Sequence, residues 1–355
     1  MSTPIHSEQT VTMPTSLTDS ATQTFGKVLS PLATNQLIGT LTEIGIRNEA
    51  RTRALAELWL RPAEKLTGIE RQSTRWRRKE RAAVADAHQL RPGVARPKVH
   101  WHVGGSETAP ALLLINGWTA NGVTWPSAWL ADLESRYRVI RIDNRGTGWS
   151  RTAPAPFTVA DMADDAYDVL TACGINRASV IGLSMGGMIS QELAIRHPEV
   201  VDELILCGTR PPTPDHILPD LSVMTSLLDS PGKGEDIGKF LADTWGPITG
   251  PGFAEAHPEV IEELVGQIMA RLTPRGGMMA QARALWCWHG ADRLARIKAP
   301  TTVIHGNRDP LMPVGNGMRL ARLIPGARYV ELAGVGHLVP QEAGAEITAA
   351  MVPRT

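Results

Sequence analysis

Short apolar runs alternate with longer amphipathic stretches between residues 99 and 207. Continuous apolar runs are typical of strands buried on both faces, whereas apolar positions at helical spacing predict helices. We therefore expect strands at 99–103, 111–115 and 137–142, a short strand ending at Gly182, and another at 203–207. Strands and helices that alternate with short links predict right-handed crossovers and a mostly parallel sheet.

The intervals between these runs carry helix signals. A helix is expected over 125–135, and another begins at Thr158. Asp161 stands three positions after Thr158, which is the spacing of a capping box. Gly174 ends this helix, and a further helix runs from the glycine-rich segment after Gly182 to His197.

The alternation breaks at Arg210, where several prolines mark a linker. From there to residue 297 the pattern is helical, with helices expected at 221–228, 235–245, 258–272 and 277–288. Strands resume at 301–305 and 329–332. The sequence therefore predicts a helical cap, residues 210–297, inserted into an α/β core formed by 96–209 and 298–355.

The first 95 residues differ from the rest of the chain in composition and in the spacing of their apolar residues. Residues 2–24 hold eleven Ser or Thr, so 1–25 are expected to form a flexible tail. Residues 26–95 are expected to form a helical N-terminal extension, because 32–60 carry an amphipathic stripe. A basic cluster at 71–81 fits either a docking patch for an anionic surface or a solvated helix face, and the neutral chain favours the second.

Composition narrows the function classes. Lys plus Arg and Asp plus Glu both total 36, so no net field recruits nucleic acid. The cysteines, Cys173, Cys207 and Cys287, show no metal-binding spacing, and no metal or cofactor is expected. Neither a transmembrane run nor a leader pattern is present in the sequence, and we expect a cytoplasmic protein.

Ser184 stands at the centre of the segment GLSMGG, between a short strand and a helix. Glycines two positions before and after it permit a sharp, strained turn that exposes its hydroxyl. A serine hydroxyl is a weak nucleophile unless a base and an oxyanion-stabilising site are supplied elsewhere in the fold. The pattern predicts a nucleophilic serine that depends on such partners.

Five motifs, NGW, DNRGTGWS, GLSMGG, HGNRDP and GVGH, follow one another at predicted strand ends. In this order they resemble the α/β-hydrolase superfamily over residues 99–355. The resemblance implies an α/β-hydrolase fold, with a mostly parallel sheet flanked by helices, and a cofactor-free hydrolase. It does not extend to the first hundred residues.

When the catalytic roles of the family are assigned to the matching motifs, the resemblance implies that Ser184 is the nucleophile, His337 the general base and Asp309 the acid that orients His337. Some relatives place the acid after the preceding strand, where this chain has Gly208 and Thr209. Asp215, in the proline-rich linker, is the alternative candidate.

The resemblance assigns the oxyanion hole to the backbone N–H groups of Trp118 and Met185. Asn116 departs from the family, which usually has His there, and this changes how the loop is held. The Asn-Gly pair and the segment LIPGARYVELAGVGH also resemble intracellular polyhydroxyalkanoate depolymerases, although Met185 replaces a Trp expected in that group. Asp143 and Arg145 are expected to be structural rather than catalytic.

The predicted cap is rich in Met and Trp, and we expect some of these residues to line an apolar pocket. They are Met224, Met269, Met278, Met279, Trp245, Trp286 and Trp288.

The expected function is a serine hydrolase that cleaves a carboxylic ester of a hydrophobic substrate through an acyl-enzyme. Polyhydroxyalkanoate depolymerase, thioesterase, acyltransferase and carbon–carbon bond hydrolase remain open within the fold. A non-catalytic ligand-binding protein is the alternative from another class. The expected partner is a small hydrophobic ester or a polyester, and the N-terminal extension is expected to support either a homo-oligomer or binding to a hydrophobic surface.

Overall fold

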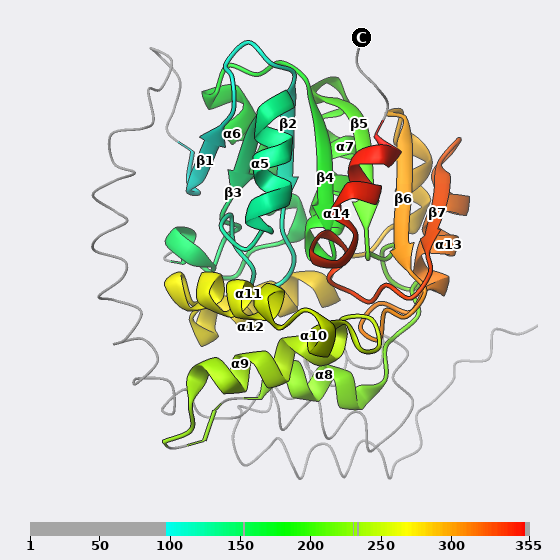
Figure 1. The fold of residues 1–355 in the computed structure, drawn as a ribbon. Coiled ribbons are helices and arrows are strands. Elements are labelled where there is room, and N and C mark those ends of the chain that lie inside the picture. Colours follow the sequence, from blue (N-terminus) through cyan, green and yellow to red (C-terminus); the bar gives the residue numbers. More distant parts are fainter. Residues whose placement is uncertain (1–96, 152, 230, 233, 352–355) are drawn as a thin grey trace, which may run out of the picture. The chain divides into compact units, whose positions relative to one another are not determined.

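The computed structural model describes residues 97–151, 153–229, 231–232 and 234–351 (Figure 1). The predicted tail, the helical N-terminal extension and the basic cluster at 71–81 all lie outside the described residues. In the described part of the chain, no helix is long and apolar enough to cross a membrane.

Within the described residues, seven strands form one sheet in the order β1-β3-β2-β4-β5-β6-β7. Among these strands, β1 runs antiparallel to β3, and the other neighbouring pairs are parallel. The strands are β1 Trp101–Gly104, β2 Ala111–Ile115, β3 Arg138–Ile142, β4 Ala178–Leu183, β5 Val201–Cys207, β6 Thr301–Gly306 and β7 Arg328–Leu332. The predicted mostly parallel sheet is confirmed.

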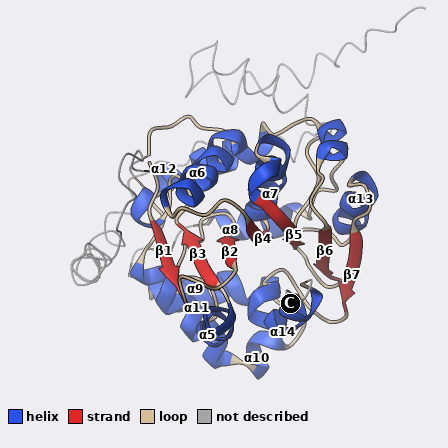
Figure 2. Cartoon of the chain, turned by 90° about the horizontal axis from the view of Figure 1, so that it is seen from above, coloured by secondary structure: helices blue, strands red, loops and turns tan. Residues whose placement is uncertain are grey.

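The central strands are apolar because both of their faces are covered. All six residues of β4 are buried, and Leu113 of β2 pairs in register with Val180 of β4. Helices α6 (Val159–Ala172), α7 (Met185–Arg196) and α13 (Gly315–Leu323) cover one face of the sheet (Figure 2). Helices α5 (Ser127–Arg136) and α14 (Val339–Ala350) cover the other.

The start of α6 shows how local sequence sets an element boundary. Thr158 is the N-cap, and its side chain accepts the backbone N–H of Asp161 at 3.1 Å. The Asp161 carboxylate in turn accepts the backbone N–H of Thr158 at 2.8 Å. The predicted capping box is confirmed, and it satisfies two donors that the first helical turn would otherwise leave free.

Residues 210–297 contain several helices, which gather at one end of the sheet (Figure 1). The longer ones match the predicted positions closely: α8 Leu221–Leu228, α9 Ile237–Trp245, α11 Pro258–Ala270 and α12 Arg275–Trp286. The short helix α10 (Phe253–Ala256) was not predicted, nor were α13 and α14. We call these helices, α8 to α12, the cap.

Candidate active site

Ser184 sits in the tight turn between β4 and α7. Its φ of 54° lies in the left-handed region, which is rare for a residue with a side chain. The turn is held from both sides: Ser184 N donates to the Cys207 carbonyl at 2.9 Å, and Thr209 Oγ1 donates to the Ser184 carbonyl at 2.7 Å. The strained serine is therefore fixed by the end of the neighbouring strand β5.

The glycines of the turn are required by close contacts. A Cβ at Gly186 would lie 1.9 Å from the Ile115 carbonyl oxygen, and one at Gly182 would lie 2.5 Å from the Gly186 oxygen. A side chain at either position would push α7 away from the sheet. Glycine thus lets the helix start directly behind Ser184, as the G-x-S-x-G spacing predicts.

His337 and Asp309 lie together after the last two strands. His337 Nδ1 and Asp309 Oδ2 are 2.8 Å apart, and both residues are buried. Asp215 is exposed, and its backbone carbonyl accepts from Arg319. The geometry therefore favours Asp309 over Asp215 as the partner of His337.

The Asp309 carboxylate is surrounded by donors. Its Oδ1 accepts the backbone N–H groups of Leu311 at 2.9 Å and Met312 at 2.7 Å. Burial alone would raise the pKa of this carboxyl, but the nearby His337 and His305 rings hold the pKa below its usual value. Asp309 is thus kept ionised, as an acceptor for the Nδ1–H of His337.

The loop that carries His337 is clamped by Glu342. One oxygen of Glu342 accepts the backbone N–H of Gly336 at 2.9 Å and that of Gly250 at 2.7 Å. His337 N donates to the Ile248 carbonyl at 2.7 Å. The cap segment around residues 248–250 therefore helps to position the imidazole.

Asn116 holds the loop after β2 through its side-chain amide. Its Oδ1 accepts the N–H of Gly117 at 2.8 Å, and its Nδ2 donates to Thr124 Oγ1 at 2.9 Å. A Cβ at Gly117 would lie 3.2 Å from Ser184 Cβ, so this loop packs directly against the serine.

Both predicted oxyanion donors remain available. No hydrogen bond among the described residues uses the backbone N–H of Trp118. Met185 is the first residue of α7, where a backbone N–H has no acceptor within its own helix. An oxyanion near Ser184 would find two free donors and a helix N-terminus.

Comparisons with known proteins identify the family of this chain. Residues 110–249 match the family model described as alpha/beta hydrolase fold. The RutD protein of Caulobacter segnis, whose name describes a carbamate hydrolase, is 31% identical over 249 residues, covering 68% of this chain and 88% of that protein. This chain belongs to the α/β-hydrolase superfamily. It is a hydrolase by family and by the names of its relatives.

Two further proteins are similar to this chain over most of their length. Rhodomycin D methylesterase of a Streptomyces species is 28% identical over 296 residues, covering 72% of this chain and 94% of that protein. The crystal structure of an enol-lactonase from Burkholderia xenovorans superposes with a TM-score of 0.59 at 26% identity, covering 71% of this chain and 94% of that one.

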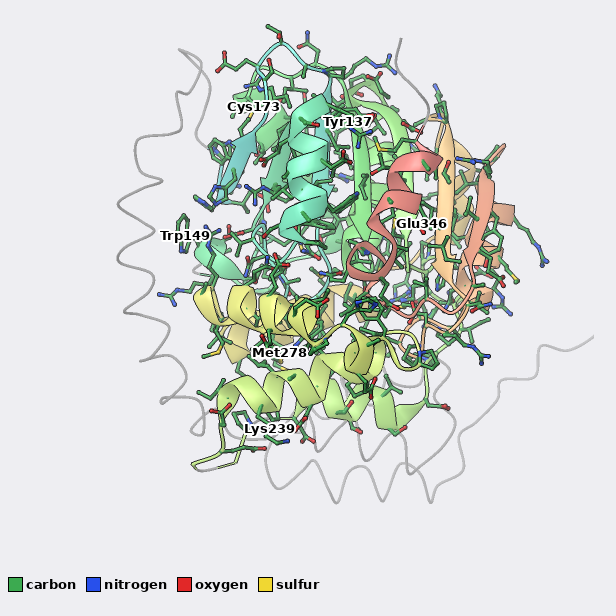
Figure 3. All side chains as sticks on the ribbon, in the orientation of Figure 1. Tyr137, Trp149, Cys173, Lys239, Met278 and Glu346 are labelled. Atoms are coloured by element: carbon green, nitrogen blue, oxygen red, sulfur yellow. The ribbon has the colours of Figure 1, made fainter. Side chains whose placement is uncertain are left out.

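The cap of this α/β-hydrolase is tied to the core by buried charges. Arg271, at the end of α11, pairs with Asp143 and stacks over the Trp149 ring at 3.7 Å. Trp149 is labelled in Figure 3, next to the cap helices. Burial keeps the pKa of Asp143 above its usual value, although Arg271 and the backbone N–H groups of Trp149 and Gly122 partly offset this effect. Arg145 pairs with Asp165 of α6. These contacts tie neighbouring elements together and agree with the prediction that Asp143 and Arg145 have structural roles.

Two cavities meet at Ser184. One, of about 40 Å³, is shared by Ser184 and His337 and is otherwise largely apolar, with Trp245, Leu264 and Ile268 from the cap. The other, of about 100 Å³, extends from Ser184 toward Trp286 of α12. Trp118, Leu227 and Leu311 line both. Trp245 and Trp286 thus line the pocket, as part of the predicted Met and Trp set.

Two polar residues of the larger cavity were missed by the sequence analysis. Arg210 and His216 both line it, although they belong to the segment interpreted as a proline-rich linker. A Pro-rich composition does not reveal which side chains turn inward. Only the contact between this segment and α12, 75 residues further along the chain, exposes their position.

Proposed function

We propose that this α/β-hydrolase is a serine hydrolase that cleaves a carboxylic ester through an acyl-enzyme. Ser184 Oγ attacks the ester carbonyl carbon while His337 takes the hydroxyl proton. The tetrahedral oxyanion is held by the N–H groups of Trp118 and Met185, and it collapses when His337 returns the proton to the departing alkoxide. Water, deprotonated by His337, then releases the acid and regenerates Ser184.

The observation that carries the proposal is the 2.8 Å contact between His337 and Asp309 beside a cavity that His337 shares with Ser184. The contact uses Nδ1 and leaves Nε2 as the ring nitrogen for proton transfer. The strained backbone of Ser184 and the two available N–H groups complete the set of parts that acyl transfer requires.

Apolar residues around Ser184 support a hydrophobic group next to the scissile carbonyl. Leu227, Leu264 and Ile268 line the smaller cavity. Burial of such a group contributes about 0.8 kcal/mol per CH₂. Aliphatic esters, including short polyester segments, are therefore the first substrates to test.

A carbamate is the second candidate, because the similar RutD protein is named for that activity. The same attack on a carbonyl carbon would release the alcohol and leave a carbamoyl-enzyme, so a matched ester and carbamate would share the leaving alcohol and differ in the group retained on Ser184. Parallel rates on matched ester and carbamate pairs separate these candidates.

A fluorophosphonate probe tests the nucleophile directly. The wild-type chain should be labelled at Ser184, as located by peptide mass spectrometry, and Ser184→Ala should not be labelled. Ser135→Ala, an exposed serine on α5, is the matched control and should label fully. Absence of labelling in a folded wild-type chain would favour the ligand-binding alternative.

Trapping identifies the intermediate. Rapid mixing with an activated aryl ester should give a burst of alcohol equal to the enzyme concentration when deacylation is the slower step. Added methanol should divert the acyl group to the methyl ester. Hydrolysis at unchanged rate without any acylated Ser184 would contradict the acyl-enzyme.

A further inference from the structure

The larger cavity at Ser184 differs in polarity from the smaller one. Most of its lining is apolar, including Met188, Leu285 and Met312, but the polar residues Arg210 and His216 line it as well. Its volume of about 100 Å³ exceeds the roughly 10–15 Å³ that one water needs. The cavity can therefore accept a substituent of the substrate as well as solvent.

Arg210 follows β5 and is 95% buried, since its exposed fraction is 5%. Its Nη1 donates to the Pro211 carbonyl at 3.0 Å and its Nη2 to the Leu285 carbonyl at 2.8 Å. Within the described residues, no carboxylate pairs with it. Burial lowers the pKa of Arg210 to about 10, so the guanidinium remains charged near neutral pH.

A buried cation without a counter-charge is costly, and carbonyl dipoles compensate for this only in part. Among the described residues the other buried arginine, Arg271, pairs with Asp143, and the partly buried Arg145 pairs with Asp165. Arg210 is the cation that faces the cavity beside the nucleophile. Its missing partner is therefore expected to be an anion that enters with the substrate.

His216 gives an independent observation that points to a ligand. Both of its ring nitrogens are buried and have no hydrogen-bond partner among the described residues. Burial, with the positive charges of Arg210 and Arg319 and the His289 ring, lowers the pKa of His216 to about 3. The ring is neutral near pH 7, so one of its nitrogens carries an N–H that has no acceptor among the described residues.

We propose that the substrate carries a carboxylate, which binds Arg210 and accepts the His216 N–H while its ester carbonyl lies at Ser184. This inference rests on the proposed function and specifies the substrate class. The planar guanidinium suits a carboxylate, and charge-assisted hydrogen bonds of this kind are strongest where water is excluded. The carboxylate is unchanged by the reaction and acts in recognition alone.

Matched substrates test the proposal without any variant. Monomethyl esters of dicarboxylic acids with four to eight carbons would be compared with the corresponding methyl ester monoamides, which are neutral and of similar shape. Proton release at constant pH measures the rate. We expect kcat/KM to be about tenfold or more higher for the acid at the best chain length. Equal values throughout the series would overturn the proposal.

Two variants locate the recognition. Arg210→Met should lower kcat/KM for the preferred monoanion about tenfold or more, and should change that for its monoamide less than threefold. His216→Phe keeps the ring but removes its N–H, and should cost the monoanion a few-fold. Arg322→Met, an exposed arginine on α13, is the control for loss of charge and should match the wild type.

Arg210 also holds two carbonyl groups, so its variant is first checked for folding by circular dichroism. If Arg210→Met does not fold, the wild-type substrate preference and His216→Phe decide the question. Unchanged preference in a folded Arg210→Met would overturn the assignment of this residue.

Calorimetric titration of Ser184→Ala separates the two proposals. Binding of the dicarboxylate, absent for the diamide and lost with Arg210→Met, supports the anion site even if no ester is hydrolysed, in which case the serine-esterase proposal alone fails. Hydrolysis of neutral esters through Ser184, without dicarboxylate binding or substrate preference, overturns the anion site and leaves the esterase standing.

Discussion

The indole N–H of Trp118 donates to the carbonyl oxygen of Met278 at 2.9 Å, which joins the loop after β2 to cap helix α12. The next residue is held in the same way, because Thr119 N donates to Gln281 Oε1 at 3.0 Å. Thr119 has a φ of 62°, so the loop is strained at this point. The cap thus stabilises the conformation that presents the Trp118 N–H near Ser184.

Trp118→Phe should therefore lower kcat by about three- to tenfold with little change in KM, because a hydrogen bond contributes roughly 1 kcal/mol. Steady-state kinetics on a short neutral ester provide the measurement. Trp125→Phe is the control, since the buried Trp125 Nε1 has no acceptor among the described residues. Equal losses of kcat in both variants would mean that ring volume, rather than the bond to Met278, is responsible.

Asp309→Asn should reduce kcat on the order of 10⁴-fold. Oδ1 accepts two backbone N–H groups, so the amide oxygen of Asn must take that place and its NH₂ must face His337. A donor there favours protonation of Nε2, the nitrogen that should act as base. Asp215→Asn is the matched control and should retain activity; the opposite pattern would move the acid to the linker segment.

Asp309 also predicts a pH dependence of stability. Burial opposes ionisation, but His337 and His305 give a net lowering of its pKa below 3.8 in the folded chain. A carboxyl group whose pKa is lower in the folded than in the unfolded chain stabilises the fold at pH values above its unfolded-state pKa. This stabilisation is lost as the pH falls through the pKa of the folded state. The difference in unfolding free energy between wild type and Asp309→Asn should be constant from pH 7 to 5. Below about pH 4 the unfolding free energy of the wild type should fall relative to that of the variant, because the Asp309 carboxylate becomes protonated. Urea titrations at each pH measure it, and a flat difference down to pH 2.5 would contradict the expectation.

Much of the fold follows from local sequence. The predicted strand 111–115 coincides with β2 at both ends. A continuous apolar segment of five residues is typical of a strand that is buried on both faces of a sheet. The Thr158 capping box fixed the start of α6. Helix α14 was not predicted, because a non-helical residue, Ala343, interrupts it and Gly344 packs against Trp129.

The site was predicted less completely than the fold. Motif order suggested Ser184, Asp309 and His337, and the structure brings Asp309 to His337 and places His337 with Ser184 at one cavity. The orientation of Arg210 and His216 depends on contacts with α12 and α13, which no local pattern encodes. Composition suggested an apolar pocket, whereas a buried cation in the larger cavity emerges only from packing.

Two adjacent glycines of α12 give a final test of the cap. A Cβ at Gly277 would lie 1.8 Å from the Gly146 carbonyl oxygen, so Gly277→Ala must displace the helix that carries Met278 and Gln281. We expect a loss of stability of about 1–3 kcal/mol, as for overpacking, together with lower kcat because the Trp118 loop loses its support. Thermal unfolding and ester kinetics measure the two effects.

Gly276→Ala is the matched control, since no described atom lies within 4 Å of a Cβ there. It should leave activity intact and raise stability by up to about 0.4–1 kcal/mol, because alanine restricts the unfolded chain at a helical position. If both variants were equally active and stable, the close approach of α12 to the loop at Gly146 would not determine the position of the cap. If Gly277→Ala lost stability but kept kcat, the cap would support the fold without organising the oxyanion loop.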